Sequence, residues 1–183
     1  MKAILLAGGK GTRLRPLTIH TPKPIVPIFN RPFLHYQLDL LKQVPEIDEV
    51  ILSLNYQPDR VESVFGDGSE IGIRIRYVVE PTPLGTAGGI KFASRDIRHT
   101  IVVFNGDVLT QIDVAAVIAM HRARSATATI VENSTSRKRY RCSRFKGVAA
   151  RDPATVPGFC APTRARQRIC PGIHIGRACG SLP

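Results

Sequence analysis

A short apolar strand at the start of the chain runs directly into a glycine-rich loop, and this junction limits the possible folds more than any other feature. Residues Lys2–Ala7 are continuous and apolar, as in a strand buried on both faces, and Gly8-Gly9-Lys10-Gly11-Thr12-Arg13-Leu14 follows at once. Glycines after a strand let backbone N–H groups approach a ligand without an intervening Cβ atom. Such N–H groups bind phosphate oxygens well, so the junction indicates a nucleotide phosphate site.

Helical and strand patterns alternate through the rest of residues 1–131. Strands are predicted at Val50–Leu54, Ile73–Val79, Ile101–Phe104 and Thr127–Val131, and helices open at Pro32 and Asp113 and span Asp59–Phe65 and Thr86–Arg98. Repeated strand–helix–strand units form a mostly parallel sheet with helices on both faces. The sequence therefore predicts one Rossmann-like α/β domain over residues 1–131.

The pattern stops after Val131, and the composition changes with it. Residues 1–132 carry 15 Lys and Arg against 13 Asp and Glu, whereas residues 133–183 carry 11 Lys and Arg against one acid, Asp152. Most of the formal net charge of +12 therefore belongs to this basic tail. Without a periodic apolar face, residues 132–183 are expected to be irregular, because they bury too little surface to offset their chain entropy.

The basic tail has three interpretations: a disordered extension, a small metal or nucleic-acid module, or sequence read in a shifted frame. Its joint enrichment in Arg, Pro, Cys and Gly favours the shifted frame. The four cysteines lie here, match no zinc or redox spacing and are interpreted as unpaired: Cys142, Cys160, Cys170 and Cys179. Nucleic acid is not the expected partner, because only three aromatic residues of the tail are available for base stacking.

The apolar run at the amino-terminal end is too short for a membrane span or a secretory signal, and glycines and charge interrupt it. We therefore expect no membrane association and a cytoplasmic location. The oligomeric state is left open.

Two charged residues stand out after the glycine loop. Lys23 lies between Pro22 and Pro24, which hold it on a stiff segment suited to meet a phosphate at a fixed place. Asp107 directly follows the buried strand at 101–104, so it is expected at the same sheet edge as the glycine loop, where a carboxylate suits Mg²⁺ on a substrate's phosphates. The alternatives are a surface lysine and a turn aspartate that satisfies its own backbone.

Together the motifs resemble those of the sugar-1-phosphate nucleotidyltransferases, also called nucleoside-diphosphate-sugar pyrophosphorylases. The matching segments are Leu6-Ala7-Gly8-Gly9-x-Gly11-Thr12-Arg13-Leu14, Pro22-Lys23-Pro24, Glu80-x-x-Pro83-Leu84-Gly85-Thr86-Ala87-Gly88 and Asn105-Gly106-Asp107. They lie within residues 1–131, and their detailed form looks most like that of the mannose-1-phosphate guanylyltransferases. The resemblance implies the fold of the nucleotide-diphospho-sugar transferases, truncated at the C-terminus.

The resemblance also implies a reaction and a set of roles. A sugar 1-phosphate oxygen attacks the α-phosphorus of a nucleoside triphosphate and pyrophosphate leaves, with GTP and mannose 1-phosphate as the expected pair. Arg13, Lys23 and Asp107 are then the catalytic residues, and Asp107 holds Mg²⁺. Besides Arg13 and Lys23, the implied nucleotide-binding residues are Leu6, Ala7, Gly8, Gly9, Gly11, Thr12, Gly85, Thr86, Asn105 and Gly106.

The sugar-binding half of this family is not recognisable in the chain. After the strand that corresponds to Thr127–Val131, relatives continue with a Glu-Lys-Pro motif, an Asn-Ala-Gly segment and a second metal-binding aspartate, and Asn133–Pro183 contains none of these. This absence favours an alternative, nucleotide binding without catalysis. A second alternative, uridylyl or thymidylyl transfer to glucose 1-phosphate, also stays open, because base preference depends on contacts in the pocket. We expect little or no turnover from this chain.

Overall fold

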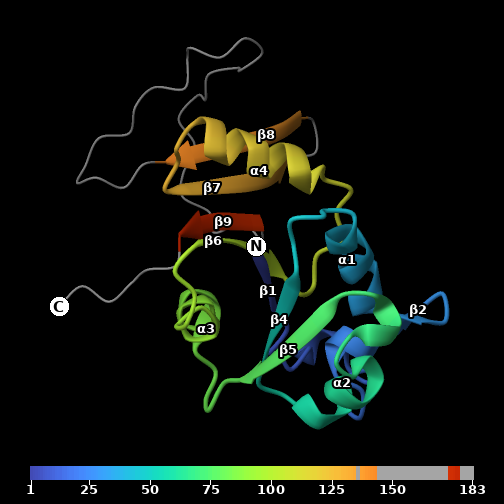
Figure 1. Ribbon diagram of the computed structural model, residues 1–183. Coiled ribbons are helices and arrows are strands. Elements are labelled where there is room, and N and C mark those ends of the chain that lie inside the picture. Colours follow the sequence, from blue (N-terminus) through green and yellow to red (C-terminus); the bar gives the residue numbers. More distant parts are fainter. Residues whose placement is uncertain (135–136, 144–172, 178–183) are drawn as a thin grey trace.

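The described residues form one main sheet of seven strands. The computed structural model describes residues 1–134, 137–143 and 173–177. The strands are β1 (Lys2–Leu6), β4 (Glu49–Leu54), β5 (Arg74–Val79), β6 (Thr100–Asn105), β7 (Ala128–Ser134), β8 (Arg137–Ser143) and β9 (Ile173–Arg177). Their order across the sheet is β5-β4-β1-β6-β9-β7-β8 (Figure 1).

Four neighbouring strands, β5, β4, β1 and β6, run parallel and form the part of the sheet that carries the pocket described below. Leu5 of β1 lies level with Leu52 of β4 and Phe104 of β6, and all three side chains are buried. β1, β4 and β6 were expected from their apolar runs and β5 from its alternation of apolar and basic residues, and the predicted Rossmann-like α/β fold is confirmed. β9, β7 and β8 extend the sheet with antiparallel pairing.

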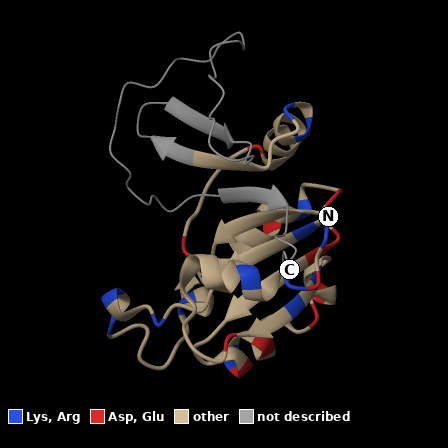
Figure 2. Cartoon of the chain, turned by 90° about the vertical axis from the view of Figure 1, so that its left-hand side faces the viewer, with Lys and Arg blue, Asp and Glu red and all other residues tan. Residues whose placement is uncertain are grey.

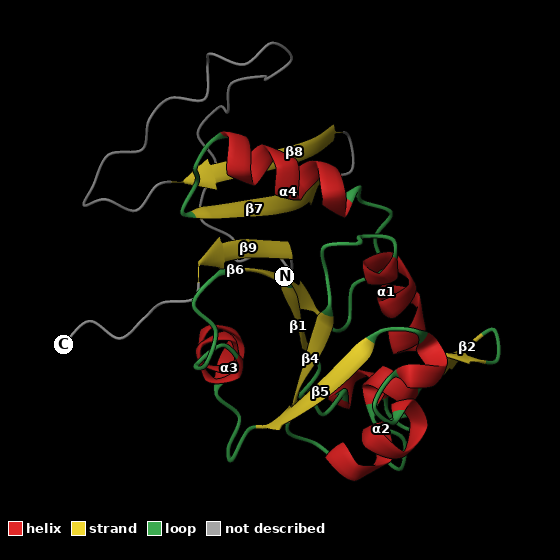
Figure 3. Cartoon of the chain, in the orientation of Figure 1, coloured by secondary structure: helices red, strands yellow, loops and turns green. Residues whose placement is uncertain are grey.

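Helices cover both faces of the sheet (Figure 3). The α-helices are α1 (Phe33–Lys42), α2 (Pro58–Phe65), α3 (Gly85–Ala93) and α4 (Val114–Ala123), and the short 3-10 helices are η1 (Thr12–Leu14), η2 (Lys23–Ile25) and η3 (Ser69–Ile71). The apolar side chains of α1, α2 and α4 pack in one cluster on one face of the sheet. α3 packs on the opposite face, where Ala93 and Ile90 meet Ile4 and Ile51.

Local sequence signals explain the buried face of α1 and the start of α4. Leu34, Leu38 and Leu41 form the buried face of α1, and the Asp113 carboxylate caps α4 by accepting from the Ala116 N–H at 2.9 Å. The predicted end of the third helix at Arg98 is wrong, because α3 stops at Ala93 and the chain turns so that Ile97 is buried against the sheet.

A small antiparallel hairpin, β2 (Pro27–Ile28) with β3 (Arg31–Pro32), joins η2 to α1 and was not predicted. Its two-residue turn holds Phe29 and Asn30 at φ of 49° and 61°. Neither residue is glycine, so the usual sequence signal for this turn is missing.

The expectation that the whole segment 132–183 is irregular is wrong for two stretches. β8 pairs with β7, and β9 lies between β6 and β7 (Figure 1). A short strand needs no long apolar face of its own when neighbouring strands offer unpaired N–H and C=O groups. Residues 144–172 and 178–183, with Cys160, Cys170 and Cys179, lie outside the described residues. No helix in the described ranges is long and apolar enough to cross a membrane.

Candidate active site

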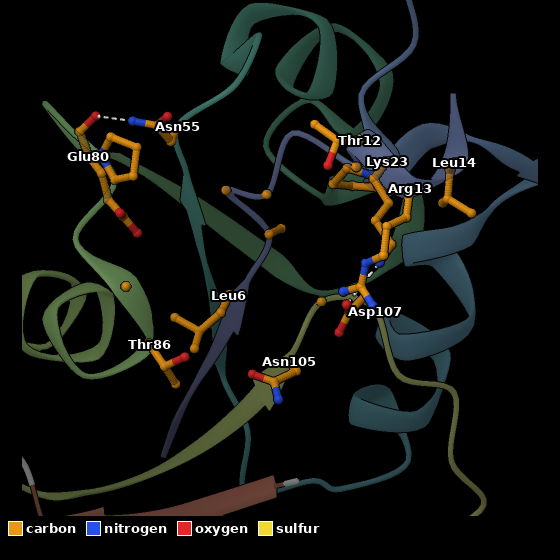
Figure 4. A pocket seen from close by; sticks show the side chains of 18 residues that line it. Leu6, Thr12, Arg13, Leu14, Lys23, Asn55, Glu80, Thr86, Asn105 and Asp107 are labelled. Carbon is orange, nitrogen blue, oxygen red and sulfur yellow. Dashed lines mark hydrogen bonds and ion pairs between the residues drawn. The ribbon is translucent and has the colours of Figure 1, made fainter. Parts of the chain in front are cut away.

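A pocket opens at the carboxyl ends of β1, β4 and β6. The chain passes from β1 outward to β4 and β5 and then returns to β6 on the other side of β1. Ligands of open α/β sheets bind at such a reversal. The cavity has a volume of about 460 Å³. Its lining residues are Leu6, Ala7, Gly8, Gly9, Gly11, Thr12, Arg13, Leu14, Lys23, Pro24, Asn55, Glu80, Pro83, Gly85, Thr86, Asn105, Gly106 and Asp107 (Figure 4).

The glycine loop after β1 makes a left-handed turn at Gly11, whose φ is 61°. A Cβ atom there would lie 3.0 Å from Cγ2 of Thr18 and 3.3 Å from Cβ of Lys23, so both conformation and space require glycine. The buried Thr18 hydroxyl donates to the Gly11 carbonyl at 2.7 Å, and the Leu14 N–H donates to the same oxygen at 2.8 Å. The loop thus has a defined shape, and Arg13 extends from it towards Asp107 (Figure 4).

Lys23 and Asp107 form an ion pair across the pocket rim. Lys23 Nζ lies 2.8 Å from Asp107 Oδ2, and the two side chains are 26% and 43% exposed. Lys23 starts η2 between Pro22 and the buried Pro24, so its backbone is rigid on both sides. The pair joins two segments that lie 84 residues apart and leaves both charges accessible to a ligand.

The turn that carries Asp107 lies directly against the end of β1. The Gly106 N–H donates to the Leu6 carbonyl at 2.8 Å. A Cβ atom on Gly106 would lie 3.0 Å from Cβ of Ala7, which is tight, and only 2.6 Å from that oxygen, which is closer than Cβ atoms approach backbone. Glycine at 106 therefore lets the loops after β1 and β6 meet in one site.

A buried carboxylate, Glu80, organises the opposite end of the pocket. Its Oε1 accepts from the Ser53 hydroxyl at 2.7 Å, and its Oε2 accepts from the Leu84 N–H at 3.0 Å. Its backbone carbonyl accepts from Asn55 Nδ2 at 3.0 Å. These bonds hold the segment that leads into α3 at Gly85, whose φ is 70°.

The pocket therefore has two chemically different ends. Figure 4 shows Arg13, Lys23 and Asp107 gathered at one side, whereas Glu80 and Thr86 lie at the other. The first end offers positive charge and an exposed glycine backbone to an anionic group. The second offers small residues and one buried acceptor to a flatter, less charged group.

All residues that the sequence assigned to the nucleotide, catalytic and metal sites line this one pocket, so their predicted placement at one sheet edge is confirmed. Their individual roles stay predictions. The sequence assignment did not include five further lining residues: Leu14, Pro24, Asn55, Glu80 and Pro83. Asn55 follows β4 and is found by the same strand-end rule that located Asp107. The other four lie in or beside the motifs already singled out.

Comparison with known proteins connects this geometry to a family. The family described as "Nucleotidyl transferase" matches residues 2–152. A mannose-1-phosphate guanylyltransferase of Mycobacterium tuberculosis is 46% identical over 129 residues, which are 70% of this chain and 36% of that protein. A UTP–glucose-1-phosphate uridylyltransferase of Synechocystis is 36% identical over 143 residues, covering 72% of this chain and 37% of that protein.

The fold is also similar to that of solved structures. HddC from Yersinia pseudotuberculosis superposes with a TM-score of 0.64 at 21% identity, covering 97% of this chain and 76% of that one. The chain spans little more than a third of the length of the two curated relatives named above.

Proposed function

The chain belongs to the nucleotidyl transferase family, and we propose that its pocket binds a nucleoside triphosphate for nucleotidyl transfer to a sugar 1-phosphate. The observation that carries this proposal is the convergence of the glycine loop with Arg13, Lys23 and Asp107 in one pocket. The charged end is suited to the triphosphate, and the end at Glu80 and Thr86 is suited to the base.

The reaction places modest demands on the protein. An oxygen of the sugar 1-phosphate bonds to the α-phosphorus while the bond from that phosphorus to the bridging oxygen breaks, and its electron pair leaves on pyrophosphate. No side chain has to form a covalent bond, so catalysis consists of alignment and charge neutralisation. Backbone N–H groups of the loop at Gly8–Gly11 supply donors for phosphate oxygens, and Arg13 and Lys23 supply positive charge.

Asp107 fits Mg²⁺ that arrives with the nucleotide. Among the described residues no group of three or more His, Cys, Asp or Glu forms a ready metal cage. Mg²⁺ needs no such cage, because it binds through one or two carboxylates, several waters and substrate phosphates. When bound, Mg²⁺ would supply further charge neutralisation on the phosphates. Lys23 neutralises Asp107 through their ion pair, and we expect a triphosphate to draw Lys23 away and free the carboxylate.

Glu80 supports GTP as the nucleotide. An ionised carboxylate only accepts hydrogen bonds and has about four lone-pair positions. One protein donor engages each Glu80 oxygen, so acceptor capacity remains for a base. The hydrogen-bonding edge of guanine presents two adjacent donors, N1–H and the N2 amino group, whereas uracil presents a single N3–H between two carbonyls. The name of the Mycobacterium tuberculosis relative supports the same nucleotide and mannose 1-phosphate as its partner.

The variant Glu80→Gln tests this choice. Glutamine has nearly the same shape as glutamate. It can still accept from the Leu84 N–H and can donate to the Ser53 hydroxyl. However, its amino group is a donor where glutamate has a second acceptor oxygen. We expect binding of GTP relative to UTP to weaken about tenfold, as measured by calorimetry with each nucleotide. Ser53→Ala is the matched control, because it removes the internal hydrogen bond between Ser53 and Glu80 without changing the group that meets the base. An unchanged GTP-to-UTP ratio in Glu80→Gln would contradict guanine recognition by this residue.

Binding and turnover are separate questions for this chain. The absence of recognisable sugar-side motifs from Asn133–Pro183 favours a second candidate function, nucleotide binding without catalysis. Pyrophosphate release with GTP and mannose 1-phosphate, run beside UTP with glucose 1-phosphate, distinguishes the two. We expect little or no release, because a sugar phosphate that is not aligned forfeits about 7–11 kcal/mol of the advantage of an intramolecular reaction. Turnover at a rate typical of the family would show that the tail completes the sugar site.

A further inference from the structure

A buried polar side chain on α1 contacts the turn that carries Asp107, although it does not line the pocket. Gln37 is 2% exposed and lies on the apolar face of α1 with Leu34, Leu38 and Leu41. A buried amide is costly unless it is hydrogen-bonded. The position of Gln37 therefore points to a specific interaction that an apolar residue could not make.

The Gln37 side chain binds the backbone on both sides of Asp107. Its Nε2 donates to the Asn105 carbonyl at 2.9 Å and to the Val108 carbonyl at 2.7 Å. Because both partners are acceptors, only the amino end of the amide can face them. The turn has one further internal bond, from the Val108 N–H to the Asn105 carbonyl at 3.3 Å. Gln37 thus contributes the two shortest of these three bonds.

The same helix is also tied to the segment that carries Lys23. The Phe33 N–H, at the start of α1, donates to the Val26 carbonyl at 3.0 Å, and the Val26 N–H donates to the Lys23 carbonyl at 3.2 Å. The ion pair between Lys23 and Asp107 completes a ring of contacts that runs through α1. Through this ring, α1 sets the position of the Asp107 backbone relative to Lys23.

We propose that Gln37 is a positioning residue that holds the turn at Asn105–Val108 so that the Asp107 carboxylate faces Lys23 and the phosphate end of the pocket. This proposal rests on the proposed function of Asp107 in metal-dependent nucleotide binding. Gln37 does not touch substrate or metal. It acts through the backbone of the turn, so its loss should lower metal-dependent binding more than binding without metal.

The test compares Gln37→Met with Tyr36→Phe in the full chain. Methionine keeps the length of the side chain but removes both donors. Tyr36 is the neighbouring residue of α1, and its hydroxyl donates to the Ile28 carbonyl at 2.8 Å. Tyr36→Phe is therefore a matched control, because it also loses a hydrogen bond from a side chain to the backbone. That bond does not involve the turn at Asn105–Val108. Two quantities are measured: the hydrogen-exchange rate of the Val108 amide, and GTP binding with and without Mn²⁺ as the metal probe.

We expect Gln37→Met to speed exchange at Val108 and to weaken Mn²⁺-dependent GTP binding by about five- to tenfold, with Tyr36→Phe close to the unchanged chain in both. Unchanged exchange at Val108 would overturn the proposal whether or not Asp107 binds metal. Faster exchange with unchanged metal dependence would also overturn it.

The variant Asp107→Asn distinguishes a wrong proposal for Gln37 from a wrong proposal for the metal-binding role of Asp107. If Asp107→Asn binds GTP and Mn²⁺ like the unchanged chain, the assigned role of Asp107 is wrong, and the positioning role of Gln37 falls with it. If Gln37→Met does not fold, Gln37→Glu replaces it. That carboxyl group faces two carbonyls and donates only when protonated, so metal-dependent binding should recover as the pH is lowered towards about 6. No recovery would overturn the proposal.

Discussion

The two ends of the parallel strands carry charges in contrasting ways. At the amino end, Lys2, Glu49 and Arg74 are the first residues of β1, β4 and β5, and strand register places them side by side. Lys2 Nζ lies 2.6 Å from Glu49 Oε2, and Arg74 Nε lies 3.5 Å from Glu49 Oε1. Basic and acidic residues accordingly lie among one another near the N-terminus (Figure 2).

At the carboxyl end, the charged residues come from loops rather than from strands. Arg13, Lys23 and Asp107 follow β1 and β6 and are held by glycines, prolines and a few backbone hydrogen bonds. Asp107 is 43% exposed, whereas the Glu49 side chain is only 7% exposed. The contrast teaches that the same sheet uses charge for stability where register places the buried carboxylate of Glu49 between basic neighbours, and leaves Lys23 and Asp107 partly exposed where the segments after β1 and β6 carry them.

The largest expected effect on stability lies at the amino end. Glu49→Gln removes the carboxylate that faces Lys2, Arg74 and Arg76, and leaves these cations close together. We expect the free energy of unfolding to fall by about 2 kcal/mol, measured by urea denaturation, with GTP affinity of the folded protein unchanged. Glu70→Gln, at an exposed carboxylate, is the control. Equal stability of the two variants would remove the contrast between the ends.

At the carboxyl end, Asp107→Asn should change binding and leave stability nearly unaffected. Its partner Lys23 is partly exposed, and exposed ion pairs contribute less than about 1 kcal/mol to stability. We expect Mg²⁺-dependent GTP binding to weaken about tenfold, because a neutral amide is a poorer ligand for Mg²⁺ than a carboxylate. Calorimetry with and without Mg²⁺ measures this. A large loss of stability would show instead that this pair resembles the amino-end cluster.

The smallest expected effect is the response of the amino end to acid. Desolvation raises the pKa of Asp48, but hydrogen bonds from the amino terminus and backbone outweigh it, so the pKa lies below its ordinary value. The pKa of Asp96 is lowered in the same way, with burial opposed by backbone bonding and by Arg76. As the pH falls, the two carboxylates are therefore protonated in the unfolded chain before they are protonated in the folded protein. Their contribution to the free energy of unfolding is present above about pH 4 and is lost as the pH falls further.

Urea denaturation between neutral pH and acid measures that loss. Asp96→Asn should lose less stability over this range than the unchanged chain, by a small margin because Asp96 is half exposed. Parallel losses in the two proteins would show that the ion pair between Arg76 and Asp96 contributes nothing at the amino end.

Sequence reasoning recovered the parallel part of the sheet because its strands and helices are encoded by local apolar patterns. It did not recover β8 and β9, whose order comes from pairing with β7 and β6 rather than from their own composition. It placed the predicted site residues around one pocket, because glycines, prolines and an aspartate follow strands at one edge. It did not assign Asn55, although this residue follows β4 as Asp107 follows β6, and it did not assign Gln37, because the hydrogen bonds of Gln37 depend on partners distant in sequence.

By itself, the sequence determined that apolar strands end in a glycine loop and in Asn105-Gly106-Asp107, and therefore that these motifs lie together at the carboxyl edge of an α/β sheet. Only the tertiary structure decided that Lys23 pairs with Asp107, that Glu80 is buried at the opposite end of the pocket, and that Gln37 donates to the turn that carries Asp107. The physical reason is how far apart in the sequence the interacting groups lie. Backbone conformation and apolar burial follow from neighbours along the chain, whereas hydrogen bonds and ion pairs form between groups that only the completed fold brings within about 3 Å of each other.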